Sequence, residues 1–191
     1  MKIGVMAIQG DFAAHARALS RLGVAPFEVR TESDLDGIDG LILPGGESTT
    51  MLKLLTEENL VEPIKALAIA GRPLFGTCAG AILLAREVAN PAQPSLSLID
   101  IGIERNAYGR QVDSFIGEAR TVLEGGPLEA VFIRAPRIKR VGLEVDVLAD
   151  VGGEPVFVRE KNILAATFHP ELTEDSRPHT VFLDLVRRSI A

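Results

Sequence analysis

The stretch Phe75-Gly76-Thr77-Cys78-Ala79-Gly80 decides the fold of this chain. A short apolar strand, predicted at 74–76, runs through Cys78 directly into an apolar helix, predicted at 80–86. Glycines two residues before and two residues after Cys78 let the strand and the helix pass close to each other. The segment therefore predicts a strand-to-helix unit of the kind from which α/β folds are built.

The N-terminal half repeats this alternation of strand and helix. Its predicted strands lie at 2–8, 25–30 and 40–43, and its predicted helices at 12–22, 49–55 and 60–70. Asp11 is the expected N-cap of the first helix. The nearly continuous apolar strands are typical of a sheet that is buried on both faces. The order of elements predicts a parallel sheet covered by helices.

The C-terminal half has shorter elements. Its predicted strands lie at 98–104, 115–123, 130–134, 144–151, 155–159 and 163–168, and a last amphipathic helix at about 178–190. We expect some of these strands to extend the main sheet and others to form antiparallel hairpins beside it. No repeat or long linker interrupts the sequence, so we expect one domain over residues 1–191.

The composition and charge of the chain exclude several classes of protein. The chain has 191 residues, with 20 basic and 26 acidic side chains and a net charge of −6, which argues against nucleic-acid binding. No apolar run reaches the roughly 18 residues of a membrane span, and we expect no signal peptide. The single cysteine allows neither an internal disulfide nor a cysteine-rich zinc site. We therefore expect a cytoplasmic protein without a metal or cofactor.

Cys78 is the candidate nucleophile. The turn holds its side chain at the start of a helix, where the helix dipole favours a thiolate over a thiol. The amide of Ala79 would point to the place where an acyl oxyanion develops, and so provide one donor of an oxyanion hole. The alternative is a buried structural cysteine, which is the usual role of a lone cysteine in apolar surroundings.

His169 is the candidate base among the three histidines of the chain. It ends the strand predicted at 163–168. Because residues two apart in an extended chain project to the same side, Glu171 can orient its imidazole ring. The alternative for this segment is an exposed turn. We expect His15 to pack in the core or at an interface, and His179 to face solvent or to cap the last helix.

The loop Leu43-Pro44-Gly45-Gly46-Glu47-Ser48-Thr49 also follows a buried strand. Paired glycines let backbone amides approach a ligand closely, and the amide of Gly46 would complete the oxyanion hole. The alternative is a tight turn in which Ser48 or Thr49 is the helix N-cap. A phosphate-binding loop is disfavoured, because no lysine follows the glycines and Glu47 would repel phosphate.

A cysteine turn, a Pro-Gly-Gly loop and a distant His-x-Glu together resemble the class I glutamine amidotransferases. A closer similarity, to the glutaminase subunits of pyridoxal 5′-phosphate synthase, rests on residues 8–10, 43–51, 75–80, 104–115, 132–136 and 168–175. Ala107-Tyr108 is a mild departure, since Ser-Phe is more common there. The resemblance spans nearly the whole chain and implies a three-layer, flavodoxin-like α/β fold. That fold has a mostly parallel central sheet flanked by helices and a small antiparallel addition.

The resemblance also implies an activity. It implies hydrolysis of L-glutamine to L-glutamate and ammonia, which passes to a synthase subunit within a large hetero-oligomeric complex. It implies that Cys78 attacks to form a γ-glutamyl thioester, that His169 is the general base and then the acid, and that Glu171 orients His169. The implied glutamine contacts are Gly46, Glu47, Ser48, Arg105, Ile133 and Arg134. For the two arginines, a surface salt bridge is the alternative.

The resemblance further implies that docking of the synthase controls the glutaminase. Gln9 and Gly10 lie at the end of the first strand, at the same sheet edge as Cys78, and are the expected relay to the Gly45–Gly46 amide. The alternative is that Gln9 only caps the first helix.

Two other functions stay open from the sequence. A stand-alone cysteine hydrolase, such as a peptidase or γ-glutamyl hydrolase, would use the same three residues without a partner. A non-catalytic regulatory subunit would keep the fold, although the intact set of Cys78, His169 and Glu171 argues against it. A metalloenzyme is disfavoured, because the three histidines are dispersed and no ligand pair has metal-binding spacing.

Overall fold

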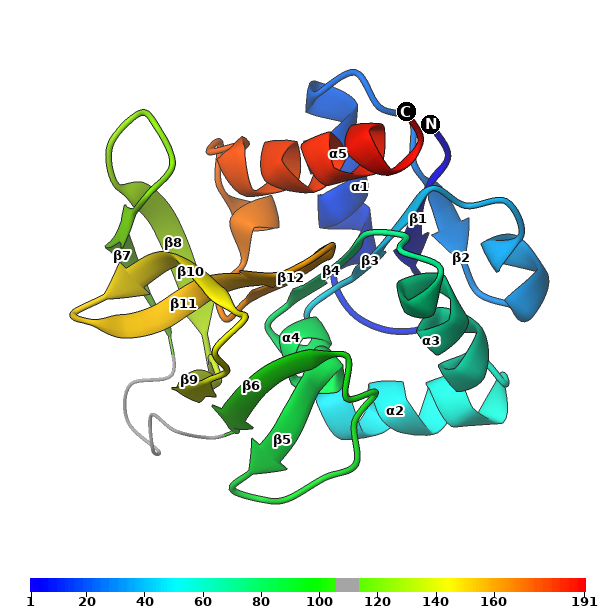
Figure 1. Ribbon diagram of the computed structural model, residues 1–191, viewed down its shortest axis with the longest axis horizontal. Coiled ribbons are helices and arrows are strands. Elements are labelled where there is room, and N and C mark those ends of the chain that lie inside the picture. Colours follow the sequence, from blue (N-terminus) through cyan, green and yellow to red (C-terminus); the bar gives the residue numbers. More distant parts are fainter. Residues whose placement is uncertain (106–113) are drawn as a thin grey trace.

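The computed structural model describes residues 1–105 and 114–191. Within them, a nine-stranded sheet has the order β2-β1-β3-β4-β12-β11-β10-β7-β8 (Figure 1). The first part of this order is parallel and consists of β2 (Phe27–Val29), β1 (Ile3–Met6), β3 (Gly40–Leu43), β4 (Leu74–Thr77) and β12 (Ile163–Ala166). This order of parallel strands is the flavodoxin-like one. The predicted fold class is confirmed.

Antiparallel strands extend the sheet beyond β12. They are β11 (Glu154–Glu160), β10 (Asp146–Val151), β7 (Ser114–Thr121) and β8 (Leu128–Ile133). A separate three-stranded sheet contains β5 (Ala85–Ala89), β6 (Ile99–Glu104) and β9 (Arg137–Val141). Both parts come from the half of the sequence in which short strands were predicted.

Helices cover both faces of the large sheet (Figure 1). One face carries α1 (Phe12–Arg21) and α5 (Arg177–Ser189), and the other carries α2 (Ser48–Glu57), α3 (Val61–Ile69) and α4 (Ala79–Leu84). Two short 3-10 helices, η1 (Glu32–Leu35) and η2 (Pro170–Leu172), complete the described elements. None of the helices in residues 1–105 and 114–191 has the length and apolar character needed to cross a membrane.

The parallel strands divide their side chains between two hydrophobic clusters. In β3, Leu41 and Leu43 pack in the cluster beside α2, α3 and α4, whereas Ile42 packs in the cluster beside α1 and α5. In β4, Leu74 and Phe75 divide in the same way. Because successive residues of a strand point to opposite faces, a continuous apolar run contributes side chains to both hydrophobic clusters.

The region after α4 differs from the sequence prediction. The helix predicted at 80–86 ends at Leu84, and the next residues form β5, which the sequence pattern did not indicate. Strand β9 also falls in a stretch with no predicted element, because its basic side chains hide the apolar Ile138. Both strands form only by pairing with β6, so their partner is remote in sequence. Local pattern could not identify them.

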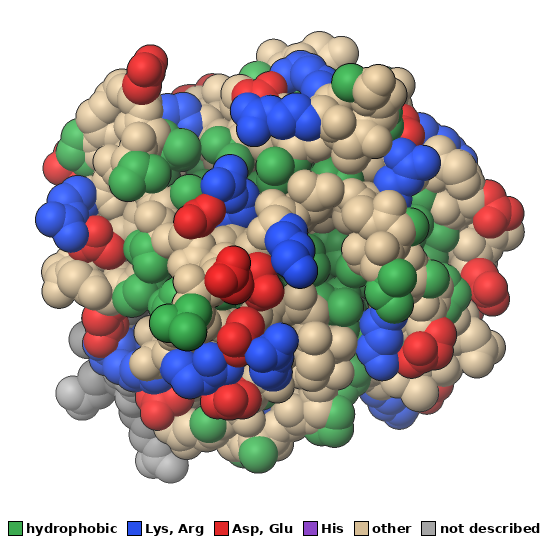
Figure 2. All heavy atoms as spheres, viewed as in Figure 1, with side chains coloured by type: hydrophobic (Ala, Val, Ile, Leu, Met, Phe, Trp, Pro, Cys, Tyr) green, Lys and Arg blue, Asp and Glu red, His purple; other side chains and the backbone are tan. Residues whose placement is uncertain are grey.

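Acidic and basic side chains are mixed over the face of the molecule in Figure 2. Around the three-stranded sheet, Arg140 lies 2.7 Å from Asp100 and 3.1 Å from Glu87. On β10 and β11, Asp146 pairs with Arg159 at 2.6 Å. Exposed pairs of this kind contribute about 0–1 kcal/mol each, so the two clusters, and not these pairs, hold the fold together.

Candidate active site

Cys78 lies in the predicted turn between β4 and α4. Its backbone has φ 48° and ψ −104°, a conformation that side-chain-bearing residues rarely adopt. A Cβ on Gly76 would lie 2.6 Å from the Gly80 carbonyl carbon, and a Cβ on Gly80 would overlap the carbonyl of Leu43. Both glycines are therefore required by close backbone packing. The turn leaves the Cys78 side chain only 7% exposed, at one end of a cavity.

His169 follows β12 and reaches the same end of the sheet. Its Nδ1 lies 2.7 Å from Oε1 of Glu171, and both side chains are buried. Burial favours the neutral ring, but hydrogen bonds and charge interactions with Cys78 and Glu171 outweigh it and raise the pKa of His169 to about 10. The arrangement therefore favours the imidazolium form of His169.

Glu171 is buried behind His169. Burial opposes ionisation of its carboxyl group, but His15 and the hydrogen-bonded His169 hold its pKa below the usual value. The second carboxylate oxygen, Oε2, lies 3.3 Å from Nε2 of His15. His15 is buried in the core, as predicted.

The prediction for His179 is wrong. Its side chain is 1% exposed, and its Nε2 lies 3.0 Å from Nδ1 of His15. Its position at the start of α5 suggested a solvent-facing or capping role, but α5 turns this residue toward the sheet. The contact partner comes from α1, at the other end of the sequence.

The loop after β3 touches both His169 and the end of β1. A Cβ on Gly45 would overlap the imidazole of His169, so only glycine leaves room for that ring. The carbonyl of Gly45 accepts a hydrogen bond from the Asp11 amide at 3.1 Å. A Cβ on Gly10, which has φ +100°, would overlap the same carbonyl. The orientation of the Gly45–Gly46 peptide is therefore tied to the segment that follows β1.

Gln9 also contacts this loop. Its Oε1 accepts a hydrogen bond from the Glu47 amide at 3.0 Å and fills the space beside Gly46. The N-cap position of α1 is Asp11, as predicted, although its side chain makes no capping hydrogen bond. The alternative role of Gln9 as the cap of the first helix is therefore excluded.

Glu47, and not Ser48 or Thr49, is the N-cap of α2. Its carboxylate accepts hydrogen bonds from the Thr49 amide at 3.1 Å and the Thr50 amide at 2.8 Å. Burial opposes ionisation, but these donors lower the pKa of Glu47 to about 2. The alternative with Ser48 or Thr49 as cap failed because the longer carboxylate reaches two amides at once.

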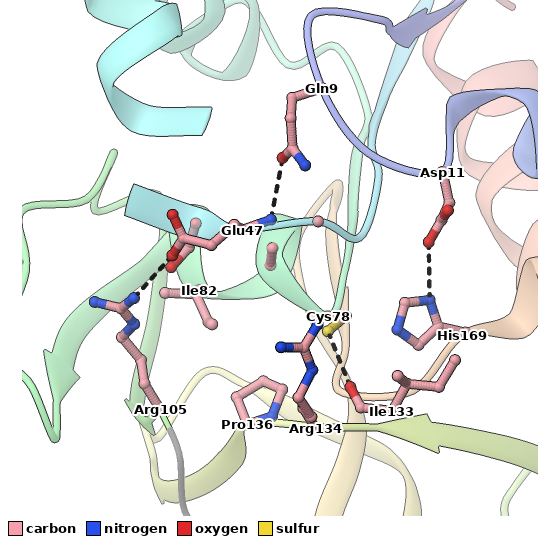
Figure 3. A pocket seen from close by; sticks show the side chains of 13 residues that line it. Gln9, Asp11, Glu47, Cys78, Ile82, Arg105, Ile133, Arg134, Pro136 and His169 are labelled. Atoms are coloured by element: carbon pink, nitrogen blue, oxygen red, sulfur yellow. Dashed lines mark hydrogen bonds and ion pairs between the residues drawn. The ribbon is translucent and has the colours of Figure 1, made fainter. Parts of the chain in front are cut away.

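In the view of Figure 3, Arg105 lies beside Glu47 and Arg134 lies nearer to Cys78. Arg105 is mostly buried, and its Nη2 lies 3.2 Å from Glu47 Oε1 and 2.9 Å from Thr49 Oγ1. Arg134 is exposed and has φ 44°, directly after β8. Within the described ranges, Arg134 has no acidic partner, so its guanidinium is available to an anionic group.

These side chains surround one cavity of about 290 Å³ (Figure 3). This volume lies near the lower end of the range for small-molecule sites, about 300–1,000 Å³. The predicted residues that line it are Gln9, Gly46, Glu47, Ser48, Cys78, Ala79, Arg105, Ile133, Arg134 and His169. Glu171 and Gly10 are the two predicted site residues that do not line it.

The sequence prediction missed Asp11, Ile82 and Pro136 as lining residues. Asp11 was assigned only a capping position, yet its Oδ2 lies 3.9 Å from His169 Nδ1. Donor atoms of Asp11, His169 and Glu171 lie within 4.8 Å of one another, but the last two already pair with each other. Residues 106–113, which include the departure at 107–108 and much of the 104–115 motif, lie outside the described residues.

A family model described as "SNO glutamine amidotransferase family" matches residues 5–188. The chain belongs to this family. The resemblance noted from the sequence is thereby confirmed, and the matched span covers almost every residue of the fold. The cysteine turn, the glycine loop and His169 with Glu171 all lie within it.

Similar proteins and solved structures support the same family assignment. Two proteins named pyridoxal 5′-phosphate synthase subunit PdxT are similar to the chain. The one from Solibacter usitatus is 54% identical over 188 residues, covering 95% of this chain and 97% of the relative. The one from Thermosipho africanus is 51% identical over 188 residues, covering 98% and 100%.

A crystal structure described as a glutamine amidotransferase superimposes with a TM-score of 0.92 at 48% identity, over 98% of this chain and 100% of that one. The structure of PurLQS from Thermotoga maritima has a TM-score of 0.69 at 18% identity, over 100% of this chain and 98% of that one. The second similarity shows a shared fold only.

Proposed function

We propose that residues 1–191 act as one glutaminase domain, in which Cys78, His169 and Glu171 hydrolyse L-glutamine to L-glutamate and ammonia. The observation that carries this proposal is the cysteine on a positive-φ turn, at a cavity that it shares with an imidazole bonded to a buried carboxylate. The ammonia passes to the synthase subunit of pyridoxal 5′-phosphate synthase, in line with the names of the relatives.

In this reaction the Cys78 thiolate attacks the side-chain carbonyl carbon of glutamine. The oxygen that becomes negative lies toward the amides of Ala79 and Gly46, which lower the barrier as hydrogen-bond donors. His169 gives its proton to the leaving nitrogen, so that ammonia departs and a γ-glutamyl thioester forms. The neutral His169 then takes a proton from water, which attacks the thioester and releases glutamate and the Cys78 thiolate.

The cavity offers matching charges for the two ends of an amino acid. The guanidinium of Arg134, which has no acidic partner in residues 1–105 and 114–191, suits the α-carboxylate, and an arginine can bind it in a bidentate way. The ionised Glu47 suits the α-ammonium, together with the carbonyl of Ile133, which lies 4.0 Å from Cys78 Sγ. Arg105 holds Glu47 in place, and Ser48 lines the same side of the cavity.

Gln9 and Gly10 form the proposed relay to the synthase. Both residues contact the loop that contains Gly46, through the Glu47 amide and the Gly45 carbonyl. A partner that moves this segment would therefore turn the Gly45–Gly46 peptide toward or away from the oxyanion. One such donor is typically worth about 3–4 kcal/mol, or about 10²–10³ in rate. That range is sufficient for a switch.

We place this activity in the cytoplasm, within a hetero-oligomeric complex. A lone catalytic cysteine needs reducing conditions to stay free, and cytoplasmic thiol systems provide them. Delivery of ammonia to a bound synthase also avoids its release into water.

The test is ammonia release from glutamine by the full chain, alone and with saturating synthase subunit. We expect synthase-dependent activity that iodoacetamide abolishes by labelling Cys78. Replacement of Gln9 by Ala should weaken the response to the synthase and leave labelling of Cys78 intact. Faster hydrolysis of peptides or γ-glutamyl peptides without the synthase would support a stand-alone hydrolase, and absence of labelling would support a non-catalytic subunit.

A further inference from the structure

A cluster of buried polar side chains lies behind the proposed active site and outside its cavity. His15, from α1, is at its centre. The Nε2 atom of His15 lies 3.0 Å from Thr77 Oγ1 and 3.3 Å from Glu171 Oε2, and its Nδ1 atom lies 3.0 Å from His179 Nε2. All four side chains are at most 4% exposed. The mechanism proposed above uses only Glu171 from this cluster.

Burial and the surrounding charges determine the protonation states of His15 and His179, the two inner histidines of the cluster. The ionised Glu171 already faces one cation, the imidazolium of His169. Burial lowers the pKa of His15 and, together with His15, lowers the pKa of His179 to about 3. Both inner rings are therefore neutral at pH 7, and each carries a single N–H.

The contacts decide which nitrogen of His15 carries its proton. An unprotonated Nε2 would place a lone pair 3.3 Å from the ionised Glu171 Oε2, an atom with no hydrogen-bond partner among the described residues. The His15 Nδ1–H would then donate to His179 Nε2. This would leave a buried N–H on His179 Nδ1, an atom with no partner in the described part of the chain.

The opposite tautomer of His15 avoids both the lone pair facing the Glu171 carboxylate and the unpaired N–H on His179. With the proton on Nε2, His15 donates to Thr77 Oγ1 and keeps the positive side of its N–H 3.3 Å from Glu171 Oε2, and Nδ1 accepts from the Nε2–H of His179. The unpartnered atom of His179 is then only a lone pair, which is less costly to bury than an unsatisfied donor.

We propose that His15 is a positioning residue for the triad: its ring is held by hydrogen bonds to Thr77 and His179, and its Nε2–H, 3.3 Å from Oε2, fixes the rotation of the Glu171 carboxylate by electrostatic attraction. With Oε2 held on the core side, Oε1 faces His169 at 2.7 Å. Thr77 directly precedes Cys78, so the His15 ring also links Glu171 to the turn that holds Cys78. This inference rests on the proposed function for the role of Glu171, but the tautomer of His15 does not depend on it.

The first measurement is the ¹⁵N spectrum of the histidine rings in the unmodified full chain at pH 7. Protonated and unprotonated imidazole nitrogens have well-separated shifts. We expect His15 to be protonated on Nε2 and not on Nδ1. Protonation of Nδ1 instead would overturn the proposal, and this readout requires neither activity nor a variant.

The second measurement compares three substitutions of His15 in the complex with the synthase subunit. The amide nitrogen of Gln can occupy the position of Nε2, whereas that of Asn can occupy only the position of Nδ1, and Leu has neither. We expect His15→Leu and His15→Asn to lower kcat by about 10- to 100-fold with KM nearly unchanged, as for other groups that orient a ligand or a base. His15→Gln should retain most of the activity.

A double-substitution comparison separates positioning from a general structural role. If His15 acts through Glu171, then His15→Leu should have little further effect on kcat in a Glu171→Ala background. An equal loss in both backgrounds, or equal activity of the Gln and Asn variants, would overturn the proposal. Lack of glutaminase activity in the unmodified complex would instead refute the proposed function and leave the ¹⁵N result to stand by itself.

Discussion

Two strand-to-helix turns lie side by side at the same edge of the sheet. One follows β3 and leads into α2, and the other follows the neighbouring parallel strand β4 and leads into α4. In the first turn, the Glu47 carboxylate accepts from the Thr49 and Thr50 amides at the start of α2. In the second turn, Cys78 has φ 48°, and α4 has no side-chain cap.

This difference separates a structural turn from the turn that holds the candidate nucleophile. The α2 turn satisfies its own amides and keeps ordinary backbone angles, so it stabilises the fold and holds Arg105. The α4 turn leaves its first amide without a side-chain acceptor and keeps a strained residue, which costs about 1–3 kcal/mol. Strained backbone of this kind is typically found at functional sites.

Substitution of Cys78 should give the largest effect. Cys78→Ala should lower glutaminase activity by about 10⁴-fold or more, because no other group can form the thioester. Cys78→Gly should be equally inactive but more stable than Cys78→Ala by about 1 kcal/mol or more, since glycine tolerates positive φ. Thermal unfolding of the two variants measures this. Equal stability would mean that the α4 turn is not strained.

Substitutions of His169 and Glu171 should lower kcat by different amounts, with the larger loss at His169. His169→Ala should lower kcat by about 10²- to 10⁴-fold, because it removes the group that transfers protons. Glu171→Ala should lower kcat by less, because it removes only the group that orients His169. Steady-state kinetics with saturating synthase test the order, and binding of glutamine serves as the control. The reverse ranking would show that their roles are wrongly assigned.

The pKa of His169 provides a direct measure of its contact with the reactive turn. NMR titration of its ring should give a pKa of about 10, and Cys78→Ala should lower that value because the cysteine is one of the groups that raise it. The unfolded chain releases this proton near 6.5, so folding takes up a proton between 6.5 and about 10. The stability from His169 is complete below pH 6.5 and is lost as the pH rises toward 10. An unchanged pKa in the variant would show that the two side chains do not interact.

Substitution of Glu47, the N-cap in the turn before α2, should give the smallest effect. Glu47→Ala should destabilise the chain by about 1 kcal/mol through loss of the cap, and Glu47→Gln should cost less because the amide oxygen still accepts. Both variants should raise the KM for glutamine if the carboxylate binds the α-ammonium. Chemical denaturation and kinetics measure the two effects separately. Unchanged KM in both variants would limit Glu47 to its structural role.

The sequence by itself determined the parallel half of the fold and located the candidate catalytic residues. Apolar runs and glycines are local signals, and they located β3, β4 and the turn at Cys78 almost to the residue. The His169–Glu171 pair was also predicted, although on the basis of an extended chain; residues 170–172 instead form the 3-10 helix η2, and the two side chains still meet at 2.7 Å. The role of Gly45 beside His169 was not predictable, since no local rule indicates which ring fills the space.

Tertiary structure alone decided the contacts between remote segments. His15 and His179 are 164 positions apart, and their hydrogen bond forms only because α1 and α5 pack on one face of the sheet. Glu47 and Arg105 are 58 positions apart, and β5 and β9 exist only as partners of β6. The physical reason is the same in each case. A buried polar group or an isolated strand is unfavourable until a distant segment supplies its hydrogen bonds, so its state depends on packing and not on its neighbours in sequence.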